Sequence, residues 1–269
     1  MKSIWTESCT IGRRDSLKGD IKTQIAVIGA GMAGILIAHR LQKQGMEVVV
    51  LEENQIGSGQ TGNTTAKITS QHGAIYSRLI CQFGERQARL YAEANQQAAE
   101  EYRKMIAENK IDCDYQQTCA CLYGKNQILL EKEAEAAKAL GLPASFEKLP
   151  LPFSTAGVVK FTEQGQFHPL KFLDAVSRNL TIYEKTKVKE VKNHLLLTDS
   201  GTVQADKIIF ACHFPFRNIP GFFFAKMHQE RSCVLALKGA DFPEGMYIGM
   251  DKPSYSIRSY QDLLLFGGE

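Results

Sequence analysis

Three glycines, spaced as Gly29-x-Gly31-x-x-Gly34, constrain this chain more than any other feature of its sequence. They follow the apolar run 24–28, typical of a strand buried on both faces, and precede apolar residues at helical spacing that end at Gly45. In such a unit the first glycine permits a tight turn and the second lets a pyrophosphate approach the backbone. The third allows close helix–strand packing. The spacing therefore predicts a dinucleotide site at a helix N-terminus.

A second apolar run, residues 47–51, completes a β-α-β unit and ends at Glu52 and Glu53. A carboxylate at this position accepts hydrogen bonds from ribose hydroxyls and repels a 2′-phosphate, which argues against an NADP-type cofactor. The alternative is a glycine turn in an ordinary α/β domain. It is less favoured, because strand, helix, second strand and acid all occur in order. FAD and NAD both suit this unit.

Composition excludes several classes of protein. The 269 residues suffice for one large domain or two modest ones, and 32 basic against 29 acidic residues leave a net charge of only +3. Without a basic stripe, no nucleic-acid partner is expected. No apolar run is long enough for a transmembrane segment. The seven cysteines are scattered and odd in number, which indicates free thiols and predicts a cytoplasmic protein.

The rest of the chain predicts a mixture of helices and strands. Residues 1–22 have no periodicity and are expected to form an extended leader. Apolar spacing and turn residues predict helices at 85–109, 131–140 and 170–179. They also predict strands at 120–123, 180–191, 207–211, 233–237, 246–248, 254–258 and 263–266, and a hairpin over 195–205.

The order of these elements favours FAD over NAD. The first β-α-β unit is followed by a glycine- and threonine-rich loop and a long helix, whereas NAD dehydrogenases continue with alternating strands and helices. On residues 25–53, 57–69, 166–173, 195–213 and 246–269, the chain resembles the FAD-dependent oxidoreductase superfamily of glycine oxidase, D-amino-acid oxidase (DAO) and D-amino-acid dehydrogenase. It looks closest to a bacterial branch whose longer members end in a Rieske domain.

The resemblance implies an α/β fold, in which a smaller α+β substrate domain with a mixed or antiparallel sheet interrupts a Rossmann-like FAD-binding domain. The FAD-binding domain is expected at 23–115 and 166–216, and the substrate domain at 116–165 and 217–269. Superfamily members continue with a segment that faces the flavin. The chain is therefore expected to be C-terminally truncated, with an incomplete substrate domain and no Rieske ligands.

The resemblance also implies which residues contact FAD. The backbone of Met32 and Ala33 would face the pyrophosphate, Glu52 and Glu53 the ribose, and Val188 the adenine. The expected cofactor-binding residues are Gly29, Gly31, Met32, Ala33, Gly34, Glu52, Glu53, Gln60, Thr61, Thr65, Ala66, Lys67, Val188 and Ala211. Thr65 to Lys67 would pass beside the isoalloxazine ring. Cys212-His213 departs from the Thr-Gly found in many relatives at the end of this strand.

The implied chemistry is oxidation of a C–N bond of an amine or amino acid by hydride transfer to flavin N5. Oxygen, a quinone and an iron–sulfur protein remain open as electron acceptors. No general base is obligatory if the amine arrives neutral, so no catalytic residue is assigned. In the superfamily Arg and Tyr hold the substrate carboxylate, which makes Arg258, Tyr255 and Tyr247 candidates. An ordinary surface arginine is the alternative for Arg258.

Three further interpretations complete the expectations from sequence. Cys119-x-Cys121 has no matching histidine, so two packed thiols are favoured over a metal pair, and no metal is predicted. A truncated, catalytically inactive dinucleotide-fold remnant or interaction domain is the alternative to an FAD enzyme. An NAD-dependent dehydrogenase is disfavoured by the hairpin and the interrupted order of elements.

Overall fold

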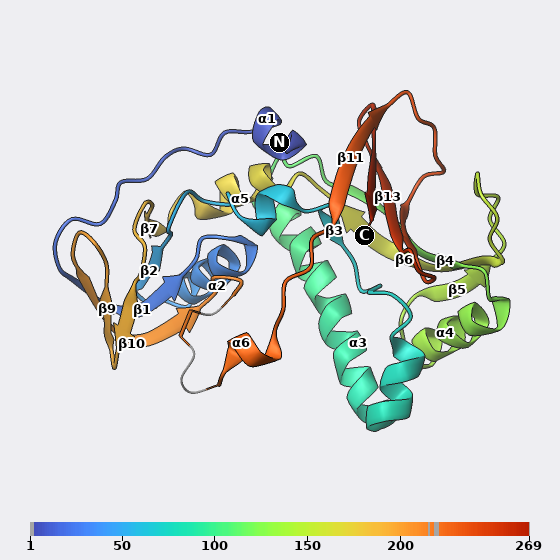
Figure 1. The fold of residues 1–269 in the computed structure, drawn as a ribbon, viewed down its shortest axis with the longest axis horizontal. Coiled ribbons are helices and arrows are strands. Elements are labelled where there is room, and N and C mark those ends of the chain that lie inside the picture. Colours follow the sequence, from blue (N-terminus) through green and yellow to red (C-terminus); the bar gives the residue numbers. More distant parts are fainter. Residues whose placement is uncertain (1–2, 215, 218–220, 269) are drawn as a thin grey trace. The chain divides into compact units, whose positions relative to one another are not determined.

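A computed structural model describes residues 3–214, 216–217 and 221–268 of the chain (Figure 1). The chain divides into two compact units, Met1–Thr64 with His168–Gln229 and Thr65–Phe167 with Glu230–Glu269. Each unit contains one sheet and its helices, and the predicted fold class is confirmed. The unit boundaries differ from the expected domain ends. Residues 65–115 belong to the second unit, and both the expected leader and residues 217–229 belong to the first.

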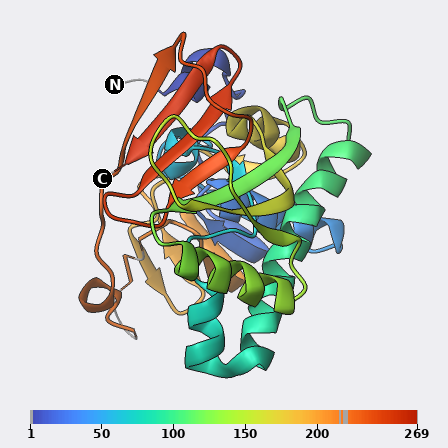
Figure 2. The same cartoon turned by 90° about the vertical axis from the view of Figure 1, so that its right-hand side faces the viewer.

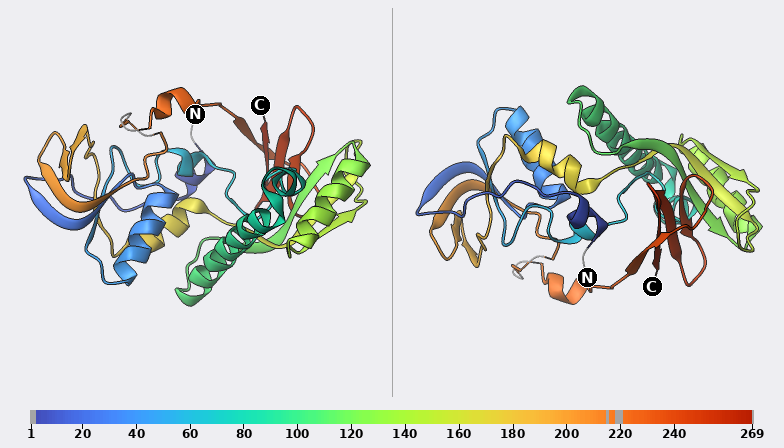
Figure 3. Two further views of the ribbon diagram at one scale, coloured as in Figure 1. Left: turned by 90° about the horizontal axis from the view of Figure 1, so that it is seen from below. Right: turned by 90° about the horizontal axis from the view of Figure 1, so that it is seen from above.

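The first unit is built on a six-stranded sheet. Its strand order is β7 (Thr181–Tyr183), β2 (Val48–Leu51), β1 (Ile21–Ile28), β10 (Thr202–Phe210), β9 (Leu195–Leu197) and β8 (Glu190–Lys192). The first four strands pair in parallel, whereas β9 pairs antiparallel with both β10 and β8. All four residues of β2 are buried, as an uninterrupted apolar run predicts. The helices α2 (Met32–Lys43) and α5 (Pro169–Ser177) pack side by side (Figure 3).

Two predicted strands of this sheet have different bounds in the structure. The expected strand 180–191 is two strands, β7 and β8, at opposite edges of the sheet. Between them, the backbone N–H groups of Lys185 and Thr186 donate to the carbonyls of Asn54 and Glu52. These bonds fix the segment to the loop after β2, so it cannot continue as a strand. The second hairpin strand and the expected strand 207–211 are one strand, β10.

The N-terminal segment is part of the first unit, so the expected extended leader is wrong. Residues Ile4–Ser8 form a short helix, α1, and the side chains of Trp5 and Leu17 are fully buried. The Trp5 indole N–H donates to the carbonyl of Thr64 at 2.7 Å, and the Trp5 and His168 rings pack edge-on. Single buried side chains without periodicity leave no pattern, which is why the sequence did not reveal this packing.

The second unit contains an eight-stranded sheet (Figure 2). Its main path runs β11 (Cys233–Lys238), β14 (Leu263–Gly268), β13 (Tyr255–Tyr260), β12 (Met246–Gly249), β4 (Gln116–Gly124), β6 (Gly157–Gln166) and β3 (Lys67–Ile68). A further strand, β5 (Ala144–Glu147), pairs with β6 outside this path. All neighbouring pairs are antiparallel except β12 and β4. The sheet is thus mixed, as predicted.

Two helices cover one face of this sheet. α3 (Tyr76–Glu108) and α4 (Gln127–Ala139) contribute Ala88, Ala92 and Leu130 to a core that includes Leu122 of β4 and Phe161 of β6. α3 begins nine residues N-terminal to its predicted start at Glu85. Gly84, with a φ of 79°, forms a kink that divides this additional part from the predicted helix. No helix in the described part of the chain is both long enough and apolar enough to span a membrane.

Candidate functional site

A cleft of about 760 Å³ lies in the first unit, where the strands β1, β2 and β10 end. Because these strands are parallel, their carboxyl ends meet at one edge of the sheet, the usual position of a ligand in open α/β sheets. The cleft is lined by the glycine turn, the end of β2, the segment 57–61, the segment 186–189 and the chain after β10. All of these segments belong to the first unit.

The glycine turn has the geometry that its spacing predicts. Gly29 has a φ of 107°, and a Cβ there would lie 2.7 Å from the carbonyl oxygen of Ala211. A Cβ on Gly34 would lie 2.0 Å from the carbonyl oxygen of Gly29, so only glycine allows α2 to approach the turn. Gly34 therefore lies behind the turn as a packing residue and does not line the cleft.

The N-terminus of α2 opens into the cleft. Gly31 is the N-cap and provides no side-chain cap, and a Cβ on it would have only Thr61 Oγ1 as a neighbour, at 3.4 Å. The Thr61 hydroxyl accepts the Met32 N–H at 3.0 Å and holds the helix η1 (Gln60–Asn63) against the turn. A helix N-terminus with unsatisfied N–H groups attracts anions such as phosphates.

Glu52 is oriented by the backbone on both sides of its carboxylate. Its Oε2 accepts the Ala30 N–H at 2.7 Å, and its Oε1 accepts the Asn54 N–H at 2.8 Å. Each oxygen retains a further lone pair for a hydroxyl donor. Glu53 is more exposed and forms an ion pair with Lys187. The acid at the end of β2 is therefore fixed beside the glycine turn, as predicted.

The segment between β7 and β8 forms another wall of the cleft. Glu184, buried at its start, accepts the backbone N–H groups of Ile56 and Arg14. The Thr186 hydroxyl accepts the Leu17 N–H. These bonds position Val188, which lies in this loop rather than on a strand, against the core of the sheet. The N-terminal segment thus supports the cleft wall from behind.

The chain after β10 keeps the backbone conformation of a glycine. The strand ends at Phe210, and the Ala211 N–H donates to the Ile28 carbonyl at 2.8 Å. His213 has a φ of 64°, the left-handed region that a glycine would occupy without strain. Cys212 and His213 both line the cleft. Cys212 and His213 therefore contribute two side chains to the cleft wall at this turn.

The structure brings ten of the fourteen predicted cofactor residues together in one cleft. The residues lining the cleft are Gly29, Gly31, Met32, Ala33, Glu52, Glu53, Gln60, Thr61, Val188 and Ala211. Thr65, Ala66 and Lys67 belong to the second unit. Sequence reasoning did not single out Thr186, Lys187 or Phe216, which also line the cleft. These residues lie in irregular loops, and only the pairing of β7 with β2 could have revealed the loop 184–189.

A cluster of polar side chains lies inside the second unit, around Lys67 and Arg258. The Lys67 ammonium donates to the Tyr247 carbonyl at 2.9 Å and to the Ser256 hydroxyl at 2.7 Å. Arg258 is fully buried, donates to the Ala66 carbonyl at 2.7 Å and lies over the Tyr260 ring. We call Lys67, Ser256 and Arg258 the cation cluster.

Burial governs the charge of the cation cluster. It lowers the pKa of Lys67 to about 7, and the nearby charge of Arg258 acts in the same direction. Burial also lowers the pKa of Arg258, to about 10. Ser256 was not predicted from sequence, although it shares the strand face of Arg258. The cluster is therefore a buried site that would favour an anion.

The three predicted substrate residues do not lie on one face of the sheet. Met246 is paired with Arg258 and Tyr247 with Ile257, so the side chains of Tyr247 and Arg258 point to opposite faces. Tyr255 stacks on Phe266, on the same face as Tyr247. Neither tyrosine candidate therefore shares a face of the sheet with Arg258, because the period of two along a strand separates odd from even positions.

The fold and the cleft define a dinucleotide-binding protein with a discontinuous α/β unit. Residues 24–269 match the family described as DAO, FAD dependent oxidoreductase. The chain belongs to this family. FAD is the cofactor named in the family's description, in agreement with the expectation from sequence.

Curated relatives extend well beyond this chain. It is 35% identical over 285 aligned residues to "Putative Rieske 2Fe-2S iron-sulfur protein YhfW" of Bacillus subtilis, covering 99% of the chain and 56% of the relative. It is 25% identical to gamma-glutamylputrescine oxidoreductase of Escherichia coli, covering 73% of the chain and 50% of the relative. The chain thus spans about half the length of these relatives.

Solved structures share the fold. L-proline dehydrogenase from P. horikoshii superposes with a TM-score of 0.71 at 19% identity, over 94% of this chain and 70% of that one. Glycine oxidase from Geobacillus kaustophilus has a TM-score of 0.65 at 18% identity, over 92% of this chain and 71% of that one. At these identities the likeness concerns the fold alone.

Proposed function

We propose that the chain binds FAD in the cleft of the first unit, as part of an oxidoreductase acting on the C–N bond of an amine or amino acid. The observation that carries the proposal is the N-terminus of α2, which begins at the cleft-lining Gly31 without a side-chain cap, together with the fixed Glu52 carboxylate. A pyrophosphate suits the helix N-terminus, and a ribose diol suits the Glu52 carboxylate. The family and the activities named for its relatives, a gamma-glutamylputrescine oxidoreductase and an L-proline dehydrogenase, support the same chemistry.

The residues of the first unit would bind and orient the cofactor. The backbone of Gly31 to Ala33 would hold the pyrophosphate, Glu52 the ribose, and Val188 the adenine. Bound FAD supplies the acceptor for the hydride. We assign Thr65 to Lys67 to the flavin side on the resemblance alone.

The cation cluster would hold the carboxylate of an amino-acid substrate. Arg258 presents a guanidinium fork that matches a carboxylate, and Lys67 gains charge when an anion lies beside it. L-proline dehydrogenase and glycine oxidase, which share this fold, are both named for amino-acid substrates. The electron acceptor remains open between oxygen, a quinone and an iron–sulfur protein. The free cysteines accord with our proposal of a cytoplasmic protein.

The visible absorption spectrum of the purified 269-residue chain tests this function. We expect a flavin band, and FAD as the chromophore identified by mass after its release. Gly31→Val should remove the band, because its side chain would occupy the space beside Thr61 that a pyrophosphate needs. Gly12→Val is the matched control, since a Cβ at Gly12 meets nothing within 4 Å.

The outcomes of this test separate the alternatives. A colourless chain that stays colourless after FAD addition would contradict the proposed site. Equal FAD occupancy in Gly31→Val and the unaltered chain would contradict the assigned pyrophosphate position. FAD binding without turnover of any amine with an artificial electron acceptor would favour a non-catalytic dinucleotide-fold protein.

A further inference from the structure

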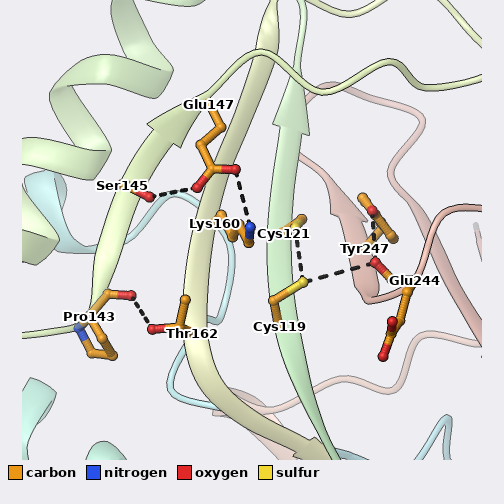
Figure 4. A network of polar contacts seen from close by, with 9 residues as sticks. All are labelled: Cys119, Cys121, Pro143, Ser145, Glu147, Lys160, Thr162, Glu244 and Tyr247. Carbon is orange, nitrogen blue, oxygen red and sulfur yellow. Dashed lines mark hydrogen bonds and ion pairs between the residues drawn. The ribbon is translucent and has the colours of Figure 1, made fainter.

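Two cysteine side chains meet on the face of the second sheet that is turned away from α3 and α4. Cys119 and Cys121 are alternate residues of β4 and project from the same side of the strand, with their sulfur atoms 3.9 Å apart (Figure 4). Their neighbours in the core, Ala120 and Leu122, point to the helices. The proposed FAD function uses neither thiol.

The two thiols differ in exposure. Cys121 is fully buried in a core cluster with Tyr247 and Ile257, whereas Cys119 is partly exposed at the edge of that cluster. The sulfur of Cys119 also lies 3.9 Å from the carbonyl oxygen of Glu244. A dissolved oxidant can therefore reach Cys119 before it reaches Cys121.

Charged groups around the pair favour a thiolate on Cys119. Lys160 of β6 lies directly across from Cys121 and forms an ion pair with Glu147 of β5 at 3.2 Å. A hydrogen bond from the Cys121 thiol lowers the pKa of Cys119 to about 7, and the charge of Lys160 acts in the same direction. Burial and the charge of Glu244 oppose this effect.

The partner thiol keeps its proton. Its hydrogen bond with Cys119 and its burial both raise the pKa of Cys121. Tyr247 lies across from Cys121 on β12, and its pKa is raised by burial, so the phenol stays neutral. The pair thus combines one accessible sulfur that ionises readily with one protonated sulfur held beside it, the arrangement of an attacking and a resolving thiol.

The strand is interrupted where the pair must move. Thr118 pairs with Gln164 and Ala120 with Phe161, so two residues of β6, Thr162 and Glu163, form a β-bulge opposite Cys119. Within this bulge, Glu163 has a φ of 60°. A disulfide needs the sulfurs at about 2.05 Å, so Cys119 must approach Cys121. The bulge permits this approach, because Cys119 has no partner in register on β6.

We propose that Cys119 and Cys121 are a peroxide-sensitive thiol pair that closes to an intramolecular disulfide. The Cys119 thiolate attacks one oxygen of hydrogen peroxide, the O–O bond breaks, and the released hydroxide takes a proton to become water. The Cys121 sulfur then attacks the sulfenic sulfur of Cys119. The S–O bond breaks, and water leaves with the Cys121 proton. The two thiols lose two electrons in total, and peroxide is reduced to two waters.

Peptide mapping of the peroxide-treated chain tests the pair. Cleavage before Asp114 and after Lys125 releases residues 114–125, which contain Cys119 and Cys121 and no other cysteine. After brief peroxide exposure and alkylation, we expect this peptide to be unalkylated and two hydrogens lighter. The exposed thiol of Cys81 is the internal reference. An alkylated pair in a sample whose Cys81 is already oxidised would overturn the proposal.

Two variants establish the order of attack. In Cys121→Ser, Cys119 should stop at the sulfenic acid and be trapped by dimedone. In Cys119→Ser, Cys121 should remain a free thiol, because it is buried and protonated. Oxidation of Cys121 in this variant at the rate of the unaltered chain would show that Cys119 is not the attacking thiol. If peroxide-treated Cys121→Ser is not labelled by dimedone at Cys119, this too would show that Cys119 is not the attacking thiol.

A third variant tests the role of the charge. Lys160→Met should raise the pH midpoint of Cys119 alkylation and slow its peroxide oxidation several-fold near pH 7, because the thiolate fraction falls. Lys132→Met, at an exposed position of α4, should change neither. An unchanged midpoint in Lys160→Met, in a chain with an unaltered circular dichroism spectrum, would remove the lysine from the mechanism. All of these readouts are independent of FAD.

Discussion

At the scale of single residues, the most informative positions are the two cations buried inside the second unit. Taking a cation out of water is unfavourable unless partners compensate for the lost hydration. Lys67 has a carbonyl and a hydroxyl as partners, but burial and the nearby charge of Arg258 still lower its pKa to about 7. An anionic ligand beside the cation cluster would stabilise both charges, which links this feature to a carboxylate-bearing substrate.

Replacing Arg258 should therefore affect substrates according to their charge. We expect Arg258→Ala to raise KM for carboxylate-bearing amines about ten- to hundredfold, since a hydrogen bond to a charged group contributes about 1.5–3 kcal/mol. The value of kcat should change little, because this interaction is made equally in the ground and transition states.

Steady-state kinetics with an amino acid and with its decarboxylated amine check this expectation. Arg231→Ala, at an exposed position, is the control. A KM that rises equally for both substrates would show that Arg258 has a structural role only.

Lys67 should make stability depend on pH. Its folded pKa of about 7 lies below its ordinary value of 10.5, so the unfolded chain binds more protons between these values. The free energy of unfolding should then rise with pH in this window, by at most about 1.4 kcal/mol per pH unit.

Urea unfolding of Lys67→Met and the unaltered chain from pH 7 to 9 measures this contribution. The difference in the free energy of unfolding between these two chains should change with pH across the series. For the control Lys132→Met, the difference from the unaltered chain should stay constant. Parallel curves for Lys67→Met would mean that Lys67 titrates normally.

At the scale of elements, α3 begins without a cap of its own, and α4 supplies one. The N-cap Ile75 makes no side-chain hydrogen bond, but the buried Glu133 carboxylate accepts the N–H groups of Tyr76 and Ser77 at 2.7 and 3.0 Å. It also accepts the Ser77 hydroxyl at 2.7 Å. A cap supplied by a distant helix leaves no local sequence signature, so the structure was needed to find it.

Removal of this cap should destabilise the second unit. We expect Glu133→Ala to lower the free energy of unfolding by about 1–3 kcal/mol, because buried N–H groups would lose their acceptor. Thermal unfolding followed by circular dichroism measures the loss. Glu135→Ala, two residues further along α4 at an exposed position, should have nearly the stability of the unaltered chain. Equal stability of the two variants would show that water replaces the carboxylate.

Elements with a regular pattern were predictable, and elements that depend on distant partners were not. The β-α-β unit from β1 to β2 follows from its apolar runs and glycines alone. β6 was missed although it pairs with three strands, because polar Gln164 and Gly165 interrupt its alternation. Buried Gln164 is tolerated because its carbonyl accepts the Ser70 N–H at 2.7 Å, a contact that no local rule anticipates.

At the scale of the whole molecule, the sequence predicted a discontinuous two-part chain, with domain bounds that differ from those of the two compact units. It assigned residues 65–115 to the FAD-binding domain. The structure assigns them to the second unit, where β3 joins the large sheet and α3 covers it. Similarly, the cleft was predicted from its glycines and acid, whereas its wall at 186–189 depends on the pairing of β7 with β2.

The buried N-terminal segment has a practical consequence for anyone who handles part of this protein. The family match starts at residue 24, three residues into β1. A recombinant fragment cut at that point would omit Trp5 and Leu17 and leave apolar holes where both side chains are now enclosed. It would also leave the buried Glu184 and Thr186 without the N–H donors of Arg14 and Leu17. The first residue that matches the family therefore differs from the first residue that packs in the folded unit.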